Sequence, residues 1–442
     1  YLFASRTAAD GTPFALYGLW HDRYCAIFCE NVANENVQLI YNHALVGGFK
    51  DAFKPLIKYY FDGISEFEKN ARRLYGMNGI FVGSYTTPAN YALSCFVPVI
   101  IHFTSVGAWL SQMFVDWYRF SGDDKFLKKY VLPFMAKCAE FYLDYMAYDH
   151  YGEIKIYPSV SPENTPGNLS KGKNGWGSDS SFPAVKDATI EYAARKELFT
   201  NLLELINLTG EYQDLKKPMQ KALSEFPLYR INSDGALCEW LSRELDDNYA
   251  HRHLSHIYPL FPGTEIKRED KALFYAAKKA VYLREIPSAS GWSLAHGAAI
   301  FARLNDGDSA VKQLDVLCKA CFAPNLFTYH NDPLDRGLTL RFDNPPVQLD
   351  ALMGVCTTLQ MMFLDINKNT LYLLPALPKG FEKGNVNLCF FAGKIKMKWD
   401  KPKGAFSCRI TIERDCKITV YLPKFCTGKK IIKGKAGQTV EL

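Results

Sequence analysis

The stretch "DKFLKKYVLPFMAKCAEFYLDYM" (residues 124–146) decides the fold class of this chain. Its apolar side chains recur at steps of three and four residues, the spacing that places them on one face of an α-helix. They are Phe126, Tyr130, Phe134, Cys138, Phe141, Tyr142 and Tyr145. A helix of this kind buries its apolar face against other elements, so the stretch predicts a core helix in a mainly α domain.

Similar helical patterns occupy residues 49–74, 104–121, 189–208, 269–283, 293–304, 308–321 and 350–364. Between them lie long segments rich in Pro, Gly, Asn and Trp, notably 157–187, 246–266 and 322–349. Loops of this length inside a compact domain usually carry function. We therefore expect residues 1–367 to form one helical domain, and a ring of helices with long loops suggests an α/α toroid.

The pattern changes after about residue 368 to short segments, most of them alternating, separated by Gly, Pro and Lys. Examples are "KIKMKWD" (394–400), "SCRITIER" (407–414) and "KITVYLP" (417–423). Alternation is typical of strands with one buried and one solvated face. Residues 368–442 are therefore predicted to form a small C-terminal antiparallel β domain, similar to a β-sandwich.

Composition and charge exclude several classes of protein. With 48% apolar and 22% charged residues among 442, the chain can bury a large core, which excludes disorder. The net charge is +6, and the lysine-rich C-terminal end lacks interleaved aromatics, so we expect no nucleic-acid partner. No apolar run approaches the roughly 18–20 residues of a membrane span.

The cysteines and the chain start bear on the compartment. The 12 Cys show no regular spacing, which favours buried free thiols and mildly favours a reducing space. The start, "YLFASRTAADG", has neither Met nor the features of a signal peptide, so we expect the interior of a longer protein or a processed product. Localisation stays open between export (extracellular or periplasmic) and the cytoplasm, and so does the oligomeric state.

Two loop carboxylates are candidate catalytic groups. Glu163, in "YPSVSPENTPGN" (157–168), lies between prolines that restrict the backbone. In an aromatic, partly dry site its pKa would rise and it could donate a proton, although a Glu that anchors the loop is the alternative. Asp350, in "RFDNPPVQLDALMG" (341–354), either acts on substrate or caps the following helix. Such a distant pair fits a two-carboxylate glycosidase.

Two further loops concentrate polar groups. In "NVANENVQL" (31–39), the amide oxygens of Asn34 and Asn36 could hold a water, or the pair could form a helix N-cap and turn. "AHRHLSHIYPLFPG" (250–263) has three His but no HExxH spacing and no further ligand at metal spacing, so we expect no metal. An Arg and a His that donate to sugar hydroxyls explain this loop better.

Ordered motifs along nearly the whole chain resemble the catalytic module of glycoside hydrolase family 95, the inverting α-L-fucosidases and related α-L-galactosidases. They include "GTPFALYGLWHDR", "NENVQLIY", "GAWLSQMFVDWYRFSGD", "SPEN", "TIEYAARKELF", "HRHLSHIYPLFPG", "GWSLAHGAAIFARLNDGD", "PPVQLD" and "LLPALPKGFEKGNV". No single motif is specific, but the set in this order is.

The resemblance implies an (α/α)6 toroid followed by a β domain. It implies inverting exo-hydrolysis of an α-linked L-fucose-like or L-galactose-like residue from an oligosaccharide or glycoconjugate glycan, without a cofactor. Glu163 would be the general acid, and Asn34 and Asn36 would hold a water that Asp350 polarises. The substrate-binding residues would be Arg252, His253, Trp292 and Asn344.

The sequence departs from the family pattern at positions that contact the sugar in the family. The family's His two residues before the first Asn is Val32, the His that opens the loop before the Asp is Asn344, and a His-rich stretch is replaced by "GSYTTP" (83–88). We also expect the N-terminal β domain of full-length members to be missing. Two alternatives therefore stay open: a degenerate carbohydrate-binding protein on the same scaffold, and a glycoside phosphorylase.

Overall fold

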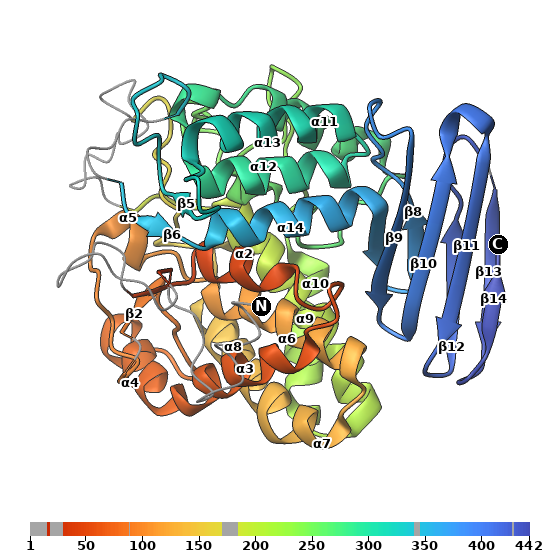
Figure 1. The fold of residues 1–442 in the computed structure, drawn as a ribbon. Coiled ribbons are helices and arrows are strands. Elements are labelled where there is room, and N and C mark those ends of the chain that lie inside the picture. The colour runs from red at the N-terminus through yellow and green to blue at the C-terminus, as the bar shows by residue number, and fades with distance from the viewer. Residues whose placement is uncertain (1–15, 18–29, 88, 170–183, 340–344, 427) are drawn as a thin grey trace.

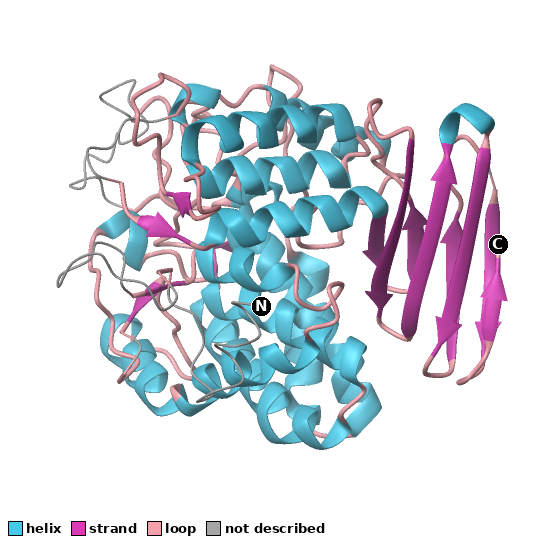
Figure 2. Cartoon of the chain, viewed as in Figure 1, coloured by secondary structure: helices cyan, strands magenta, loops and turns pink. Residues whose placement is uncertain are grey.

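The computed structural model of the chain describes residues 16–17, 30–87, 89–169, 184–339, 345–426 and 428–442. Helices dominate up to Phe363 and strands dominate after it (Figures 1 and 2). The longer helices are α2 (Asn36–Asn42), α3 (Phe53–Asp62), α4 (Ile64–Tyr75), α6 (Val106–Ser121), α8 (Leu132–Tyr145), α9 (Thr189–Thr209), α10 (Lys216–Glu225), α11 (Lys271–Tyr282), α12 (Gly291–Arg303), α13 (Gly307–Cys321) and α14 (Asp350–Phe363). The expected mainly helical class with a C-terminal sheet region is confirmed.

The helix predicted over residues 124–146 is present and consists of α7 (Asp124–Phe126), a π-helical segment (Leu127–Val131) and α8. Asp123 begins it, because its side chain accepts the backbone N–H of Phe126 at 3.0 Å. Pro133 cannot donate to the preceding turn, and the helix departs from α geometry in that turn. The predicted apolar face, from Phe134 to Tyr145, is buried in the larger of the domain's apolar clusters.

The N-terminal ends of α2, α12 and α14 lie close together. α12 packs between α13 and α14, and α14 packs against α2 (Figure 1). The close approach of α12 and α14 depends on Gly354, where an added Cβ would lie 2.8 Å from the Cβ of Ala295. Because α2 begins at Asn36, α12 at Gly291 and α14 at Asp350, this packing gathers candidate site residues from distant parts of the chain.

Two pairs of short strands complete this end of the helical domain. β1 (Asn31–Val32) pairs with β2 (Tyr85–Thr86), and β5 (Thr328–Tyr329) pairs with β6 (Val347–Gln348). β1 ends two residues before Asn34, and β6 ends two residues before Asp350. The strand pairs therefore fix the backbone on which two of the candidate groups lie.

The C-terminal region consists of two four-stranded sheets that share one apolar core. One sheet has the order β14 (Thr439–Glu441), β11 (Ala405–Ile412), β10 (Gly393–Asp400) and β9 (Lys383–Phe390); the other has the order β13 (Lys429–Gly434), β12 (Cys416–Tyr421), β8 (Thr370–Leu373) and β7 (Leu364–Asn367). Their described pairings are antiparallel except that of β8 with β12, which is parallel. Along β10 buried residues alternate with exposed lysines, as expected for solvated strand faces.

The helical and sheet regions are joined directly, since β7 follows α14 without a linker. β7 precedes the boundary that we place at residue 368, and it pairs with β8. Arg414, from the sheet region, donates to the backbone carbonyl oxygens of Arg119 and Phe391. The division into 1–367 and 368–442 stays a prediction.

One helical stretch of the described chain, Pro98–Ser121, is long and apolar enough to cross a membrane by length and composition. The sequence pattern did not single it out as a span. Of its apolar window, 83% is buried inside the protein, as in the core helix of a helical domain.

Candidate active site

A cavity of about 100 Å³ lies at the end of the helical domain where these helices begin. Its lining combines polar groups with an apolar wall: Leu16, Val32, Asn36, Tyr85, Ile100, Glu163, Arg252, His253, Trp292, His330 and Gln348. The residues come from segments more than 300 positions apart in the chain. The cavity is therefore a product of the tertiary fold and not of any one motif.

Asn34 and Asn36 each bind one of the two candidate carboxyl groups. The Asn34 Nδ2 donates to Glu163 Oε1 at 3.0 Å, and the Asn36 Nδ2 donates to Asp350 Oδ2 at 2.6 Å. The residue at the N-cap of α2 is Glu35, and its side chain makes no capping hydrogen bond. The arrangement therefore favours the interpretation in which the two amides organise a polar site over the one in which they cap a helix.

The loop that carries Glu163 is anchored by a different carboxylate, Glu239. Ser161 Oγ and Asn164 Nδ2 donate to the two oxygens of Glu239 at 2.7 and 2.8 Å, and Arg284 donates to it at 2.5 Å. Glu239 is 1% exposed. Because Glu239 performs the anchoring, Glu163 is left with its carboxyl group facing the cavity.

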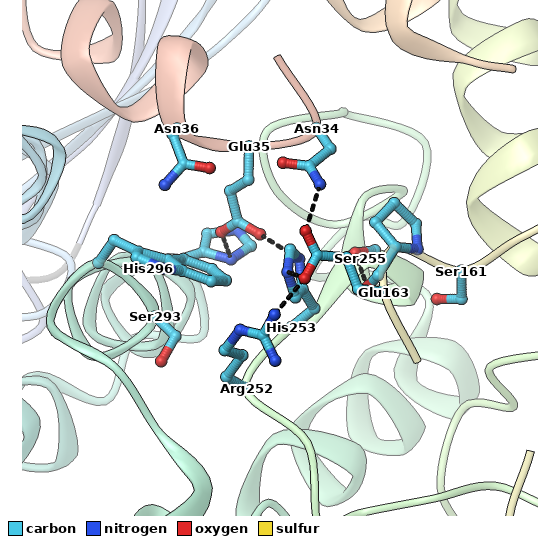
Figure 3. A network of polar contacts seen from close by, with 12 residues as sticks. Asn34, Glu35, Asn36, Ser161, Glu163, Arg252, His253, Ser255, Ser293 and His296 are labelled. Atoms are coloured by element: carbon cyan, nitrogen blue, oxygen red, sulfur yellow. Dashed lines mark hydrogen bonds and ion pairs between the residues drawn. The ribbon is translucent and has the colours of Figure 1, made fainter. Parts of the chain in front are cut away.

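Four side chains surround the carboxyl group of Glu163, and three of them, Asn34, Arg252 and His253, are labelled in Figure 3. Oε1 accepts from Asn34 and, at 3.3 Å, from the hydroxyl of Tyr85; Oε2 is bound by Arg252 and lies 3.7 Å from His253 Nε2. Burial alone would raise the pKa of Glu163, but the Arg252 charge and the His253 contact outweigh burial and hold this pKa well below its usual range. The expected rise in the pKa of Glu163 is therefore wrong, because the sequence could not show Arg252 on this carboxyl group.

Asp350 occupies the first position of α14, behind Asn36 as seen from the cavity. Its Oδ1 accepts the backbone N–H of Ala351 at 2.6 Å, while Oδ2 accepts from Asn36. The carboxyl group is fully buried. Burial raises its pKa to about 7 against the lowering effect of the Asn36 hydrogen bond, and the charge of Glu35 adds to the rise. Asp350 thus both begins a helix and contacts the candidate water-holding amide.

The predicted substrate-binding residues divide into three groups. Arg252 and His253 line the cavity but bind Glu163, and the His253 ring packs edge-on against Trp292 with centroids 4.5 Å apart. Trp292 also lines the cavity, and its Nε1 donates to His330 Nε2 at 3.3 Å. Asn344 lies outside the described residues. Val32, which stands where the family has His, belongs to the apolar wall.

Glu35 is a charged group of this site that the sequence did not lead us to propose. Its side chain is fully buried and contacts two imidazoles, with Oε2 at 3.4 Å from His253 Nδ1 and Oε1 bound to His296 Nδ1 (Figure 3). Burial opposes its ionisation, but His296 and His253 lower the pKa of Glu35 below its usual value. The feature of the sequence that could have pointed to Glu35 is the motif "NENVQL", because the family pattern has Ile at the position of this Glu.

The histidines of the 250–263 loop have separate partners. His251 stacks on His253 with centroids 5.3 Å apart, and His256 Nδ1 lies 3.8 Å from Glu239. Burial lowers the pKa of His256 to about 3. Within the described ranges, no group of three or more His, Cys, Asp or Glu side chains could hold a metal ion.

The chain is similar to one protein family and to two curated proteins over most of its length. The glycosyl hydrolase family 95 catalytic domain matches residues 1–363. Alpha-L-fucosidase 2 of Arabidopsis thaliana is 29% identical over 83% of this chain and 43% of its own length. Probable alpha-fucosidase A of Aspergillus niger is 25% identical over 92% of this chain and 52% of its own length. The chain thus spans about half the length of these curated relatives.

Among solved structures, a candidate kojibiose phosphorylase from the human microbiome resembles the chain with a TM-score of 0.66 at 12% identity. The similarity covers 99% of this chain and 63% of that protein. At this identity it shows a shared fold and nothing about substrate. The family match spans the helical domain and both carboxylates of the site, and the chain belongs to glycosyl hydrolase family 95.

Proposed function

We propose that the protein is an inverting exo-glycosidase that removes an α-linked L-fucose-like residue from oligosaccharides or glycoconjugates. One observation carries the proposal: two amides, Asn34 and Asn36, bind two carboxyl groups from distant loops, Glu163 and Asp350, beside one cavity. Inverting glycosidases need an acid on one side of the scissile bond and a water-activating group on the other. The proposal includes the (α/α)6 arrangement that the family implies for the helical domain.

The water-activating half consists of Asn36 and Asp350. Asn36 donates its N–H to the carboxylate, which makes its amide oxygen more electron-rich. That oxygen can accept a hydrogen bond from water and orient it for attack. Asp350 does not line the cavity itself, so it acts on the water through Asn36.

The acid half requires a change at Glu163. Arg252 keeps the carboxyl group ionised, and a general acid must carry a proton. A sugar hydroxyl in the cavity would compete for the Arg252 guanidinium, and the loss of that charge from Oε2 would raise the pKa of Glu163. Binding of the correct sugar would thus allow Glu163 to take up the proton that a general acid needs.

The apolar wall supports a 6-deoxy sugar in preference to L-galactose. Leu16, Val32 and Ile100 contribute apolar side chains to the lining of the cavity. A methyl group suits such a wall, whereas a hydroxymethyl group would lose hydrogen bonds to water there. We expect kcat/KM for an aryl α-L-fucoside to exceed that for the matching α-L-galactoside, and Val32→Thr to narrow the difference.

The test of the main proposal is hydrolysis of an α-L-fucosyl oligosaccharide followed by NMR. Inversion requires the β-anomer as the first product, whereas an initial α-anomer would contradict it. Glu163→Gln should abolish hydrolysis of the oligosaccharide and retain more activity on a nitrophenyl fucoside, whose leaving group needs no proton.

A second function, sugar binding without turnover, is favoured by one observation: Arg252 and His253 both contact Oε2 of Glu163, which disfavours the protonated form that an acid needs. It predicts a calorimetric binding signal for fucose with no release of sugar over days. Measured hydrolysis that depends on Glu163 would exclude this second function.

A further inference from the structure

His253 lies between two carboxyl groups, with one ring nitrogen facing each (Figure 3). Its Nδ1 is 3.4 Å from Glu35 Oε2, and its Nε2 is 3.7 Å from Glu163 Oε2. The ring is held edge-on by Trp292. A neutral imidazole carries one N–H, so a ring with carboxylates at both nitrogens favours the doubly protonated form.

Glu35 and His253 are both buried, so the charge of each strongly affects the ionisation of the other. Glu35 is fully buried and His253 is 1% exposed, and an ionised carboxylate at such a site needs a positive partner. Burial alone would lower the pKa of His253, but the contacts to Glu163 and Glu35 outweigh burial and raise it. The titratable or charged groups around the ring are Glu35, Glu163, His251, Arg252 and His330, with His296 behind Glu35.

We propose that Glu35 is a positioning residue that holds His253 protonated with its Nε2–H directed at Glu163, so that His253 supplies the proton that Glu163 delivers to the leaving group. The proposal rests on the acid role of Glu163 proposed above. It assigns a role to a carboxylate at a position where the family pattern has an apolar residue. His296, on the other oxygen of Glu35, fixes the rotamer of that carboxylate.

The proposed proton transfer is balanced. When Arg252 turns to the sugar, the His253 Nε2–H bond breaks, an O–H bond forms on Glu163 Oε2, and the imidazole is left neutral with its proton on Nδ1. Glu163 then transfers the proton to the glycosidic oxygen as its bond to the anomeric carbon breaks. Solvent in the cavity reprotonates Nε2. The 3.7 Å separation must shorten for the transfer, as catalytic contacts commonly do when substrate binds.

The test uses Glu35→Gln, which removes the charge and keeps the shape. The alkaline limb of the kcat/KM profile, measured with an oligosaccharide, should move to lower pH by about one unit, because an opposite charge at this distance is worth roughly one to three pKa units. Glu35→Asp keeps the negative charge, so its alkaline limb should lie closer to the wild-type pH than that of Glu35→Gln. An unmoved limb would overturn the proposal.

Two controls separate this role from a structural one. Glu191→Gln makes the same change at an equally buried Glu, which accepts from Thr104 and Ser105 and does not line the cavity; it should cost stability without moving the limb. In a His253→Asn background, Glu35→Gln should cause no further shift of the limb, since the effect passes through His253. A full additional shift would show that Glu35 acts on Glu163 directly and would contradict the proposed route through His253.

A measurement on the native protein keeps the inference testable if Glu35→Gln does not fold or if no substrate is hydrolysed. In ¹⁵N-histidine NMR spectra, with the His253 signals identified by their loss in His253→Asn, both ring nitrogens should stay protonated above pH 6.5. A ring that titrates at or below that value would overturn the proposal even in an active enzyme. Absence of hydrolysis with a protonated His253 would instead count against the proposed function.

Discussion

At the scale of single residues, the burial of Asp350 leads us to expect that its carboxylate lowers the stability of the protein while it supports catalysis. Its pKa rises from 3.8 to about 7 on folding, so its contribution to stability is intact below pH 3.8 and is lost as pH rises through 7. A shift of this size corresponds to about 4 kcal/mol at pH 8. Asp350→Asn should therefore raise the free energy of unfolding at pH 8, leave it nearly unchanged at pH 3.5, and reduce kcat by about 10²-fold or more.

Urea unfolding at the two pH values checks this prediction, and Glu163→Gln supplies a control of opposite sign. Arg252 and His253 lower the pKa of Glu163, so its ionised form adds stability that is present above its unfolded pKa and is lost on acidification. Glu163→Gln should thus destabilise the protein at pH 8. Equal losses of stability for the two variants at pH 8 would contradict the assigned environments.

Asp350 also predicts the acid limb of the pH–rate profile. If its carboxylate polarises Asn36, kcat/KM should rise with pH through about 7 as Asp350 ionises. Because Asp350 acts on the water through Asn36, Asn36→Ala should lower the rate and flatten this limb, whereas Asn36→Asp should move it to higher pH, since a second carboxyl group beside Asp350 opposes its ionisation. An acid limb at the same pH in wild type and both variants would assign the limb to another group.

The sequence predicted part of this site, and the missing part has a physical reason. Ordered motifs led to Asn34, Asn36, Glu163 and Asp350, which the fold brings together in two hydrogen-bonded pairs. Glu35 was missed because a Glu between two Asn is usually solvated. Its burial is created by His253 and His296, more than 200 positions away. Contacts to Arg252, 89 positions further along the chain, and to His253 decide the sign of the pKa shift of Glu163.

At the scale of elements, helix packing around Gly354 predicts a loss of site geometry. A Cβ at this position would lie 2.8 Å from Ala295 Cβ, which is attached to the backbone and cannot rotate away. Gly354→Ala should separate α14 from α12, cost about 1–3 kcal/mol and lower kcat, since Asp350 begins α14. Thermal unfolding and kinetics measure both effects.

A double variant distinguishes packing from helix propensity. Ala295→Gly alone should destabilise α12, but combined with Gly354→Ala it should restore part of the lost stability, because one Cβ then occupies the space. Additive losses in the double variant would mean that the contact between α12 and α14 is not the cause.

The elements differ in how well the sequence predicts them. Apolar periodicity located α14 and α12 to within one or two residues. α14 has a buried stripe of the expected spacing, whereas all 13 residues of α12 are buried. The same periodicity predicted one segment for residues 49–74, where the structure has α3 and α4 separated at Gly63. The apolar period continues across this break, so it is invisible to the pattern. The two-residue strands β1 and β6 depend on distant partners and carry no local signal.

At the scale of the whole molecule, alternation predicted the C-terminal sheets but not their topology. Between β8 and β12 the chain forms β9, β10 and β11 of the other sheet. β12 then pairs with β8 in the parallel direction. Strand order of this kind is decided by which faces share the core, and alternation within a strand carries no information about it. The sheets meet the helical domain at a second cavity of about 140 Å³, whose acidic and basic side chains pair with one another.

Asp365 at this junction predicts how strongly the sheet region supports the helical domain. It lies in β7, is 1% exposed, accepts from Arg268 at 2.5 Å and lies 3.3 Å from Arg303 Nε. Asp365→Ala would leave two largely buried guanidinium groups without their counter-charge, and losses of about 3–5 kcal/mol are typical of such a change. Urea unfolding should show this loss, with the sheets unfolding before the helices.

The matched control is Lys368→Ala, three residues further along the chain. Lys368 contacts Glu204 at 2.8 Å, but both side chains are more than 40% exposed, so its removal should cost less than about 1 kcal/mol. Replacing Asp365, Arg268 and Arg303 together by Leu, Met and Met should recover most of the loss, because an apolar set needs no counter-charge. If Asp365→Ala costs no more than Lys368→Ala, the two regions are held together by apolar packing around α14 and β7, and the buried charges there contribute no net stability.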